Sequence, residues 1–247
     1  MVFILKGLKI TKVYSLTNKE IELLRGSYTP FLMLKELYLT AENQKEKVSL
    51  WLEECKKMKR YVAFEFDISR AALLVLDMQN FFLDRNNHAF IPSAENIIPN
   101  IIELVNFFKR NNRPIIFSQH IDTEEPKEMM TKWWRDSVKA GSEDSKIIPQ
   151  LNTTLGEILV KTRYSAFEKT DLEEKLKEKG INQLIVTGIM AHLCCETTVR
   201  DAFMKDFEIF FLVDANATYT EELHVGTIKA IAHGFGRCVS TEVITNG

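Results

Sequence analysis

The sequence has few cysteines, no excess of charge of either sign and no long apolar run at its start. Its four cysteines are an adjacent pair, Cys194 and Cys195, and two separate ones, Cys55 and Cys238, which is not the pattern of a secreted disulfide framework. The opening run Met1–Lys6 is too short for a signal peptide or a membrane span, so we expect a cytoplasmic protein. With 32 basic and 34 acidic side chains the formal net charge is −2, which favours neither nucleic acid nor an anionic membrane as a partner. We therefore expect a small-molecule substrate bound in a pocket.

The chain also lacks internal repeats and low-complexity linkers. Its 247 residues, 45% of them hydrophobic, are enough for one α/β domain and an appendage. Residues 1–62 read as a mostly helical N-terminal extension, with a capped helix start at Thr17 and a charged amphipathic helix over Glu42–Lys59. We expect the extension to pack on the main domain or to form an oligomer contact, and a lid over a crevice is a further alternative. Residues 63–247 are expected to form the main domain.

After Tyr61, apolar stretches alternate with helical patterns, which is typical of βαβ units and a parallel sheet. The predicted strands are Ala71–Leu76, Pro114–Ser118, Glu157–Val160, Gln183–Thr187, Glu208–Val213 and Cys238–Ile244. The predicted helices are Ala94–Asn111, Lys127–Val138, Asp171–Lys179, Cys194–Lys205 and Thr220–His233. The pattern predicts a three-layer α/β/α fold around a six-stranded, mainly parallel sheet.

The segment Gly188–Ala202 places a cysteine where a predicted strand turns into a helix. Unpaired N–H groups and the positive end of the helix dipole at such a point stabilise a thiolate, the reactive form of cysteine. Cys194 is therefore a candidate nucleophile. Cysteines are also common in apolar cores, so Cys194 alone is equally consistent with packing.

Two other apolar runs end in a charged residue, Asp77 in one and Lys161 in the other. In open α/β sheets the ligand crevice lies at the carboxyl ends of the strands, so both side chains are expected to meet Cys194 there. A carboxylate that moves protons, a cation and an attacking sulfur make a coherent hydrolytic set. Taken singly, Asp77 is also consistent with a turn or cap, and Lys161 with a solvated strand end.

Three motifs carry a resemblance to a known family. They are Asp77-Met-Gln79, the strand-end Lys161, and a glycine, cysteine and threonine spaced as Gly188, Cys194 and Thr198. Over about residues 66 to 244 the chain resembles the isochorismatase-like hydrolase superfamily, also called cysteine hydrolases. The resemblance implies a six-stranded parallel sheet with helices on both faces, a catalytic triad of Asp77, Lys161 and Cys194, and a homo-oligomer, either a dimer or a tetramer.

The resemblance also implies a cis peptide between Ile189 and Met190, which directs the N–H groups of Met190 and Cys194 toward a developing oxyanion. Many amidases of the superfamily have aspartate two residues before the nucleophile, where this chain has His192. The segment Arg163–Phe167 and His192 are instead similar to true isochorismatases, which cleave an enol ether and lack the cysteine.

We therefore expect hydrolysis of a small amide-like C–N bond through a Cys194 thioester. The alternatives are enol-ether hydrolysis driven by Asp77 without covalent catalysis, and a non-catalytic binding protein on the same fold.

Substrate contacts are predicted around the ends of the strands. An aromatic wall and a cation suit a small planar substrate with a carboxylate. Trp133 and Trp134 are equally consistent with a role as core or interface anchors. Because adjacent helical residues point about 100° apart, at most one of them is expected to face the pocket. The predicted substrate-binding residues are Gln79, Phe82, His120, Trp134, Arg163, Tyr164 and His192.

The resemblance raises the question of zinc, because nicotinamidases of this superfamily bind it through an aspartate and two histidines. His120 and Asp122 would supply two ligands, and His88 is the nearest candidate for a third. A catalytic zinc site needs at least three protein ligands, so we expect neither an obligatory metal nor another cofactor. His224 and His233, in the last predicted long helix, are expected to be solvated or capping residues.

Overall fold

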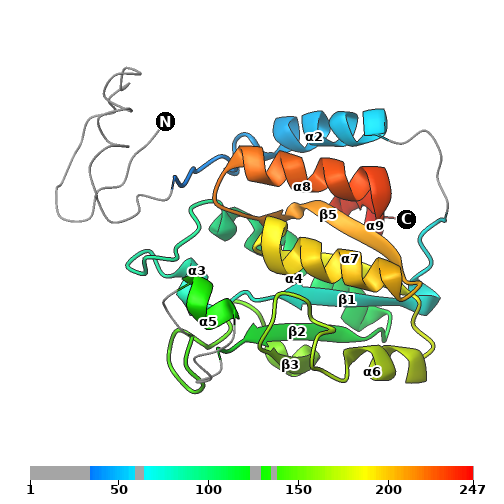
Figure 1. Ribbon diagram of the computed structural model, residues 1–247. Coiled ribbons are helices and arrows are strands. Elements are labelled where there is room, and N and C mark those ends of the chain that lie inside the picture. Colours follow the sequence, from blue (N-terminus) through cyan, green and yellow to red (C-terminus); the bar gives the residue numbers. More distant parts are fainter. Residues whose placement is uncertain (1–33, 59–63, 123–128, 135–137, 247) are drawn as a thin grey trace.

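The computed structural model describes residues 34–58, 64–122, 129–134 and 138–246. These residues form a six-stranded sheet with the order β3-β2-β1-β4-β5-β6, in which all neighbouring strands are parallel (Figure 1). The strands are β1 Ala71–Leu76, β2 Ile115–His120, β3 Glu157–Lys161, β4 Gln183–Ile189, β5 Glu208–Ala217 and β6 Arg237–Val239. The predicted sheet is confirmed, and five of its six strands lie within a few residues of the predicted bounds.

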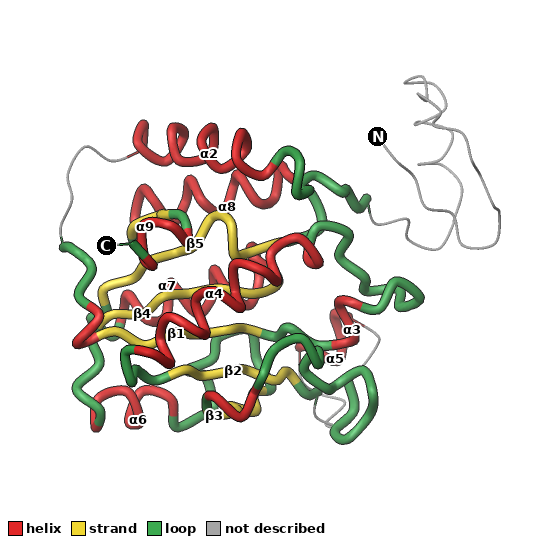
Figure 2. Tube along the Cα trace, turned by 180° about the vertical axis from the view of Figure 1, so that it is seen from behind, coloured by secondary structure: helices red, strands yellow, loops and turns green. Residues whose placement is uncertain are grey.

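Helices cover both faces of the sheet, which confirms the three-layer architecture. The pair α7 and α8 lies on one face, and α4 and α9 lie on the other (Figures 1 and 2). The helices of the described residues are α2 Gln44–Met58, α3 Asn80–Leu83, α4 Ile98–Arg110, α5 Met129–Trp134, α6 Leu172–Glu178, α7 Glu196–Met204, α8 Glu221–Gly234 and α9 Thr241–Thr245. None of them combines the length and apolar character that a bilayer-spanning helix requires.

The two central strands explain why the apolar runs are continuous rather than alternating. Every residue of β1 and of β4 is buried, because a parallel sheet covered on both faces has no solvent side. The edge strand β3 alternates, with Ile158 and Val160 exposed. The core therefore runs through β1 and β4 and holds their carboxyl ends in fixed positions.

The predicted strand Cys238–Ile244 is wrong after Val239. Strand β6 ends at Val239, and Thr241–Thr245 form the helix α9. The carboxylate of Asp214 accepts hydrogen bonds from the backbone N–H and the hydroxyl of Thr241, at 2.9 Å to Oδ1 in each case. A side-chain oxygen that caps the first N–H groups favours a helix, and this one comes from a distant strand.

The amphipathic helix predicted over Glu42–Lys59 is present as α2 over its described part, and the predicted helix start at Thr17 lies outside the described residues. Helix α2 packs on the outside of α8, with Trp51 and Cys55 buried (Figure 1). The predicted domain boundary, oligomeric state and location stay predictions.

The expectation that His224 is a solvated or capping residue is wrong. The imidazole is fully buried, with ring-centroid distances of 5.6 Å to Tyr38 and 4.5 Å to Trp51, and its Nε2 lies 3.1 Å from the Val213 carbonyl oxygen. The sequence of α8 alone predicts one solvent-exposed side. That side is covered by α2, which lies far from α8 in the sequence. His233 is exposed.

Candidate active site

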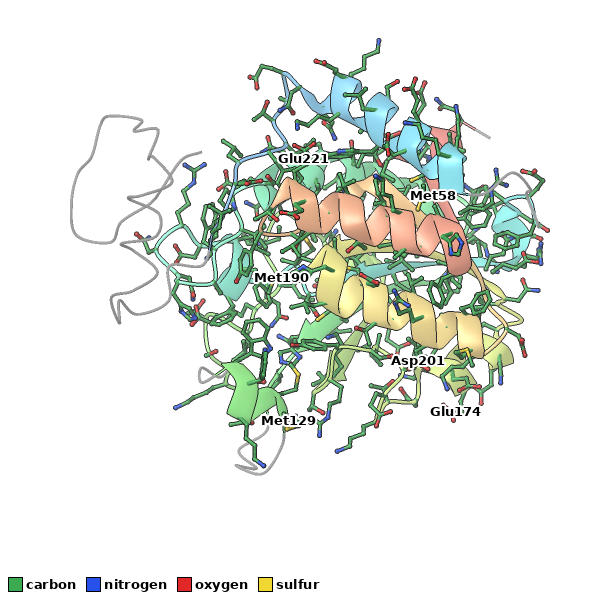
Figure 3. The ribbon with its side chains drawn as sticks, turned by 45° about the horizontal axis from the view of Figure 1, so that its top comes forward. Met58, Met129, Glu174, Met190, Asp201 and Glu221 are labelled. Carbon is green, nitrogen blue, oxygen red and sulfur yellow. The ribbon has the colours of Figure 1, made fainter. Side chains whose placement is uncertain are left out.

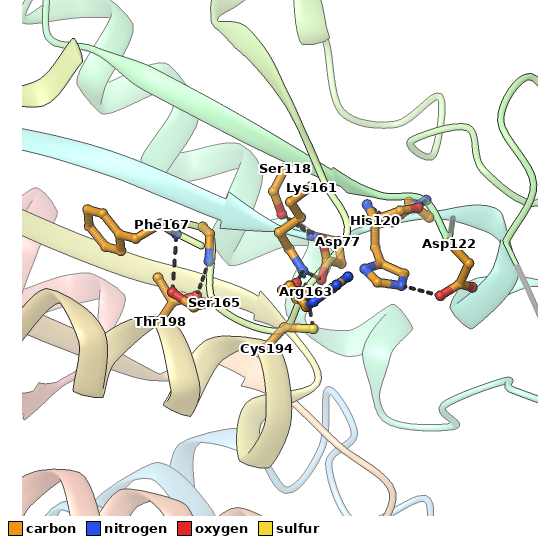
Figure 4. Close-up of polar contacts among 12 residues, drawn as sticks. Asp77, Ser118, His120, Asp122, Lys161, Arg163, Ser165, Phe167, Cys194 and Thr198 are labelled. Carbon is orange, nitrogen blue, oxygen red and sulfur yellow. Dashed lines mark hydrogen bonds and ion pairs between the residues drawn. The ribbon is translucent and has the colours of Figure 1, made fainter. Parts of the chain in front are cut away.

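The three residues from the ends of three apolar runs meet in one buried cluster. Asp77 follows β1, Lys161 is the last residue of β3, and Cys194 lies in the turn after β4 (Figure 4). The Nζ of Lys161 lies 2.8 Å from Asp77 Oδ2 and 3.4 Å from Cys194 Sγ. Asp77 and Lys161 have side chains that are 0% exposed, and Cys194 is 8% exposed. One ammonium group therefore bridges the carboxylate and the sulfur.

Close packing of β1 against β4 fixes the backbone that leads into the turn carrying Cys194. Gly188 pairs with Leu76 and has a φ of +115°, a conformation that glycine adopts freely. A Cβ at this position would clash with the Leu76 carbonyl oxygen, so a glycine is required. The peptide between Ile189 and Met190 is cis, as the resemblance implied. The chain then enters a π-helical turn, Ala191–Cys195, which leads into α7.

The helix was predicted to begin at Cys194, but helical structure begins three residues earlier, at Ala191. Cys194 therefore lies inside the first turn. Its sulfur still reaches Lys161, because the turn follows directly on the end of β4.

The protonation states of the cluster follow from burial and charge. Burial would raise the pKa of the Asp77 carboxyl, but the charges of Lys161 and His120 and the hydrogen bonds of Cys194 and Lys161 together outweigh burial and hold that pKa below its usual value. Burial would lower the pKa of the Lys161 ammonium, but the Asp77 charge raises it. Burial, and then the Asp77 charge, raise the pKa of the Cys194 thiol far above its usual value. At neutral pH the resting cluster is a carboxylate, an ammonium and a neutral thiol.

The resting thiol differs from the thiolate expected at a helix start. Full burial beside a negative carboxylate disfavours a second negative charge, and this outweighs the opposing effect of Lys161. The proton on sulfur must therefore leave when the substrate reacts.

Ser118 is a site residue that the sequence reasoning missed. Its hydroxyl donates to Asp77 Oδ1 at 2.6 Å and accepts from the Asp77 backbone N–H at 3.1 Å. From the described residues, Asp77 Oδ2 accepts no well-aligned hydrogen bond, although Lys161 lies beside it. The available signal was positional, since Ser118 ended the predicted strand next to the one that carries Asp77.

Gln79 and His120, two of the predicted substrate-binding residues, bond to each other. The Gln79 amide accepts from the His120 N–H at 2.8 Å and donates to the carbonyl oxygens of His120 and Ser145, both at 2.9 Å. Gln79 is 0% exposed, so its side chain ties the loops together and offers no free edge to a substrate. The His120 ring is buried, with Nε2 3.0 Å from Asp122 Oδ1.

The aromatic residues form a second group near the cluster. Trp134 is half-buried and its indole N–H donates to the Tyr164 hydroxyl at 2.5 Å, whereas Trp133 is 71% exposed. The two tryptophans thus differ in burial, and the expectation that at most one of them faces the pocket stays a prediction. Phe82 is 8% exposed and packs in the core against Phe81, with ring centroids 5.0 Å apart.

The loop after β3 carries Arg163 and Tyr164, and α7 holds it in place. The Thr198 hydroxyl accepts from the Ala166 N–H at 3.0 Å (Figure 4). The Ser165 hydroxyl donates to Asp201 Oδ2 at 2.6 Å. Thr198 belongs to the motif that contains Cys194. Its contact with Ala166 gives the threonine of that motif a structural role, because it attaches the loop after β3 to the helix that follows the nucleophile.

Arg163 donates to the Thr162 carbonyl oxygen at 2.8 Å, and its own carbonyl oxygen accepts from Lys161 Nζ at 2.9 Å. His192 is half-buried, and its Nδ1 lies 2.5 Å from the Thr218 hydroxyl. Burial lowers the pKa of His192, so its imidazole is neutral at pH 7.

Comparison with known proteins assigns this arrangement to a family. The isochorismatase domain model matches residues 71–243, which include all three residues of the cluster. The chain belongs to the isochorismatase family. It is 39% identical to Nicotinamidase 3 of Arabidopsis thaliana over 70% of this chain and 85% of that protein. It is 36% identical to enterobactin synthase component B of Escherichia coli over 73% of this chain, and it spans 64% of that relative's length.

Solved structures share the fold. A cysteine hydrolase from Pseudomonas syringae superimposes with a TM-score of 0.72 at 23% identity, over 76% of this chain and 96% of that one. A nicotinamidase from Bacillus subtilis gives a TM-score of 0.64 at 25% identity, over 69% of this chain and 99% of that one. The protein is thus an isochorismatase-family hydrolase, and the matched region starts after the N-terminal extension.

The described residues around His120 do not form a three-ligand zinc site. Asp122 is paired with His120 and also accepts from the Val138 N–H at 2.7 Å. His88, the candidate third ligand, packs edge-on against Phe81 at 5.4 Å between ring centroids. Across the described parts of the chain, no three His, Cys, Asp or Glu residues group in a way that would hold a metal ion.

The predicted oxyanion donors lie in the turn beside the sulfur. Met190 is 8% exposed, and its carbonyl oxygen accepts from the N–H groups of Leu193 and Cys195 at 3.0 Å and 3.3 Å. These bonds fix the start of the turn. The assignment of the Met190 and Cys194 N–H groups to an oxyanion stays a prediction.

Proposed function

We propose that this isochorismatase-family hydrolase cleaves the C–N bond of a small carboxamide through a thioester on Cys194, with Asp77 as the proton carrier and Lys161 as the electrostatic partner of both. The observation that carries the proposal is the position of Lys161 Nζ, 2.8 Å from the carboxylate and 3.4 Å from the sulfur. A nucleophile, a base and a cation within hydrogen-bond reach are the parts that covalent hydrolysis requires.

The proton begins on sulfur and is carried by Asp77. As the sulfur attacks the carbonyl carbon, its proton passes to the Asp77 carboxylate and a C–S bond forms. The protonated Asp77 then gives this proton to the leaving nitrogen, and the C–N bond breaks to release the amine. Water attacks the thioester with Asp77 again as base, and the carboxylic acid and the free thiol are the final products.

Lys161 stays protonated throughout this sequence. Because its pKa is raised by the Asp77 charge, it is a fixed positive charge rather than a proton donor. It stabilises the negative charge on the carboxylate at rest and on the sulfur during attack. The predicted N–H groups of Met190 and Cys194 would hold the negative oxygen of the tetrahedral intermediate, a role worth about 3 kcal/mol for each donor in comparable sites.

A planar aromatic carboxamide suits the neighbourhood of the cluster. Trp134 and Tyr164 are joined by a hydrogen bond and are half-buried, which leaves parts of both rings accessible. Relatives of this chain include Nicotinamidase 3, which is 39% identical to it. Nicotinamide is therefore the first substrate to test.

Enol-ether hydrolysis is the second candidate. It is supported by the Arg163–Phe167 segment and by the 35% identity to an isochorismatase of Bacillus subtilis, of which this chain spans 56%. In that reaction Asp77 would protonate a vinyl carbon and water would add to the resulting cation. This requires a protonated Asp77, whereas Lys161 holds the pKa of this carboxyl low. The electrostatics thus favour the amide reaction.

Kinetics of two cysteine variants distinguish the candidates. We expect Cys194→Ala to lower kcat/KM for nicotinamide by about 10³-fold or more, because the attacking atom is removed. Cys195→Ala, which changes the adjacent buried cysteine, is the matched control and should keep most of the activity. Turnover of isochorismate alone, undiminished in Cys194→Ala, would instead establish the enol-ether reaction.

A further inference from the structure

Residues 35–39, here called the N-terminal strap, lie at the same end of the sheet as the active-site cluster. They contact the loop after β1 and the loop after β5. The Lys35 Nζ donates to the Phe90 carbonyl oxygen at 2.8 Å, and the Tyr38 N–H donates to the Ser93 hydroxyl at 3.0 Å. On the other side, the Glu36 N–H donates to the Tyr219 carbonyl oxygen at 2.7 Å.

The strap also holds the start of α8. The Glu36 carboxylate accepts from the Glu221 N–H at 3.0 Å, at the first residue of that helix. In Figure 3, Glu221 and Met190 lie at the same end of the molecule, and Met58 at the end of α2 lies at the other. The strap is therefore fixed beside the turn that carries the nucleophile, although it precedes the region matched to the family.

A short chain of contacts connects the strap to that turn. The Tyr38 hydroxyl, on a side chain that is 5% exposed, accepts from the buried Thr218 N–H at 3.0 Å. Thr218 follows Ala217, which pairs with Ile189 of β4. The Thr218 hydroxyl lies 2.5 Å from Nδ1 of His192, two residues before Cys194.

We propose that Tyr38 is a positioning residue for the nucleophile, acting through Thr218 and His192 on the turn Ala191–Cys195; the catalytic part of this inference rests on the proposed function. Without the Tyr38 hydroxyl, the buried Thr218 N–H loses its acceptor, and a buried unpaired donor is costly enough to shift the backbone. A shift at Thr218 moves its hydroxyl away from His192. Small displacements of a nucleophile reduce the rate strongly, because attack depends on geometry.

The first test compares two tyrosine variants that each lose one buried hydroxyl. Tyr38→Phe breaks the contact with Thr218, whereas Tyr219→Phe breaks a hydrogen bond of 3.4 Å to the Ala89 carbonyl oxygen in the neighbouring loop. Both tyrosines are 5% exposed. We expect Tyr38→Phe to lower kcat about tenfold with little change in KM, and Tyr219→Phe to lower it less than twofold.

Hydrogen exchange supplies a readout that needs no substrate. By mass spectrometry, peptides covering residues 189–195 and 214–220 should exchange faster in Tyr38→Phe than in the wild type, and as slowly as the wild type in Tyr219→Phe. If residues 189–195 exchange at the wild-type rate in Tyr38→Phe, or equally fast in both variants, the proposal is overturned. Because no turnover is involved, this result stands even if the amide substrate proves wrong.

Variants of Thr218 test the second contact. Thr218→Val removes the hydroxyl that contacts His192 and keeps the backbone N–H that donates to Tyr38. This variant should therefore show the same loss in kcat as Tyr38→Phe. Thr218→Ser keeps a hydroxyl and should have the kcat of the wild type. The double variant of Tyr38→Phe and Thr218→Val should be no slower than Thr218→Val alone, since both act through one contact. Independent losses that multiply in the double variant would contradict a single path to His192.

Discussion

At the scale of single residues, the resting cluster carries its proton on the Cys194 sulfur rather than on the Asp77 carboxyl. Cys194 lies beside an ammonium, which by itself would favour a thiolate, but burial and Asp77 raise the pKa of the thiol. Attack and proton transfer to Asp77 therefore have to occur together. A thiol reagent is expected to label Cys194 slowly for the same reason, so slow labelling does not argue against covalent catalysis.

Ser118 is expected to set the acid side of the pH profile. The Asp77 carboxylate must be ionised to accept the thiol proton, and the Ser118 hydroxyl stabilises that charge through its hydrogen bond of 2.6 Å. Ser118→Ala should raise the pKa of Asp77, so kcat/KM should fall more in acidic solution than near neutral pH. Measurement of kcat/KM across pH checks the shift of the acid limb toward higher pH.

The control for Ser118 is a buried hydroxyl of β4. Thr187 donates to the Leu74 carbonyl oxygen at 3.0 Å and has no contact with Asp77 among its hydrogen bonds. Thr187→Val should leave the acid limb in place. An unshifted limb in Ser118→Ala would mean that this hydroxyl has no influence on the base.

The sequence predicted Asp77, Lys161 and Cys194 because each interrupts an apolar pattern with a reactive group. It did not indicate Ser118 or Tyr38, since a serine or tyrosine beside a strand is common and its value lies in the partner it meets. The protonation state of Cys194 was also beyond reach, because it depends on burial and on a charge that is distant in sequence.

At the scale of elements, the contact between α2 and α8 creates a buried histidine. The imidazole of His224 is enclosed by Tyr38 and Trp51, and burial lowers its pKa to about 4 from an ordinary 6.5. The unfolded chain therefore binds one more proton than the folded chain between these two pH values. Folding stability supplied by the neutral ring is fully present above pH 6.5 and is lost as pH falls toward 4, on the order of 3 kcal/mol.

His224→Phe removes this titration and keeps a ring in the cavity. We expect denaturant unfolding to show a weaker loss of stability from pH 6.5 to 4 in His224→Phe than in the wild type. The comparison with wild type is needed because burial raises the pKa of Asp214 to about 6, which acts in the opposite direction. His233→Gln, at an exposed position of α8, is the control, and an identical pH dependence in His224→Phe and wild type would contradict the account.

The strands and long helices could be predicted because each carries its own periodicity. The C-terminal boundary of β6 could not, because Asp214 caps α9 from a strand that ends more than twenty residues earlier. The early start of helical structure at Ala191 is similar, since small and apolar residues there suit a strand, a turn or a helix equally well.

At the scale of the whole molecule, the described part of the N-terminal extension belongs to the core. Trp51 is 3% exposed, and its indole N–H donates to Glu221 at 3.1 Å. The strap and α2 thereby cover α8 and one end of the sheet. Alternation of strands and helices predicted the layers, but it did not show whether the extension packs, bridges subunits or covers a crevice, because an amphipathic helix suits all three.

Trp51→Ala tests whether the extension and the main domain unfold as one unit. We expect a loss of about 3–5 kcal/mol in the free energy of unfolding, because a large buried side chain is removed. The transition should stay single. Trp133→Ala, at a position 71% exposed, should change stability by less than about 0.5 kcal/mol. A small effect of Trp51→Ala, or a separate early transition in wild type, would show that the extension is dispensable for the core.

The central claim is that Cys194 forms a bond to the substrate. Intact-mass spectrometry of the enzyme quenched in acid during turnover of a small aromatic carboxamide measures this directly. We expect an added mass equal to the acyl group less one hydrogen, located on the peptide that contains Cys194, present in Cys195→Ala and absent from Cys194→Ala. Full turnover with no adduct under conditions that trap acyl-enzymes, or an adduct that persists in Cys194→Ala, would contradict the account.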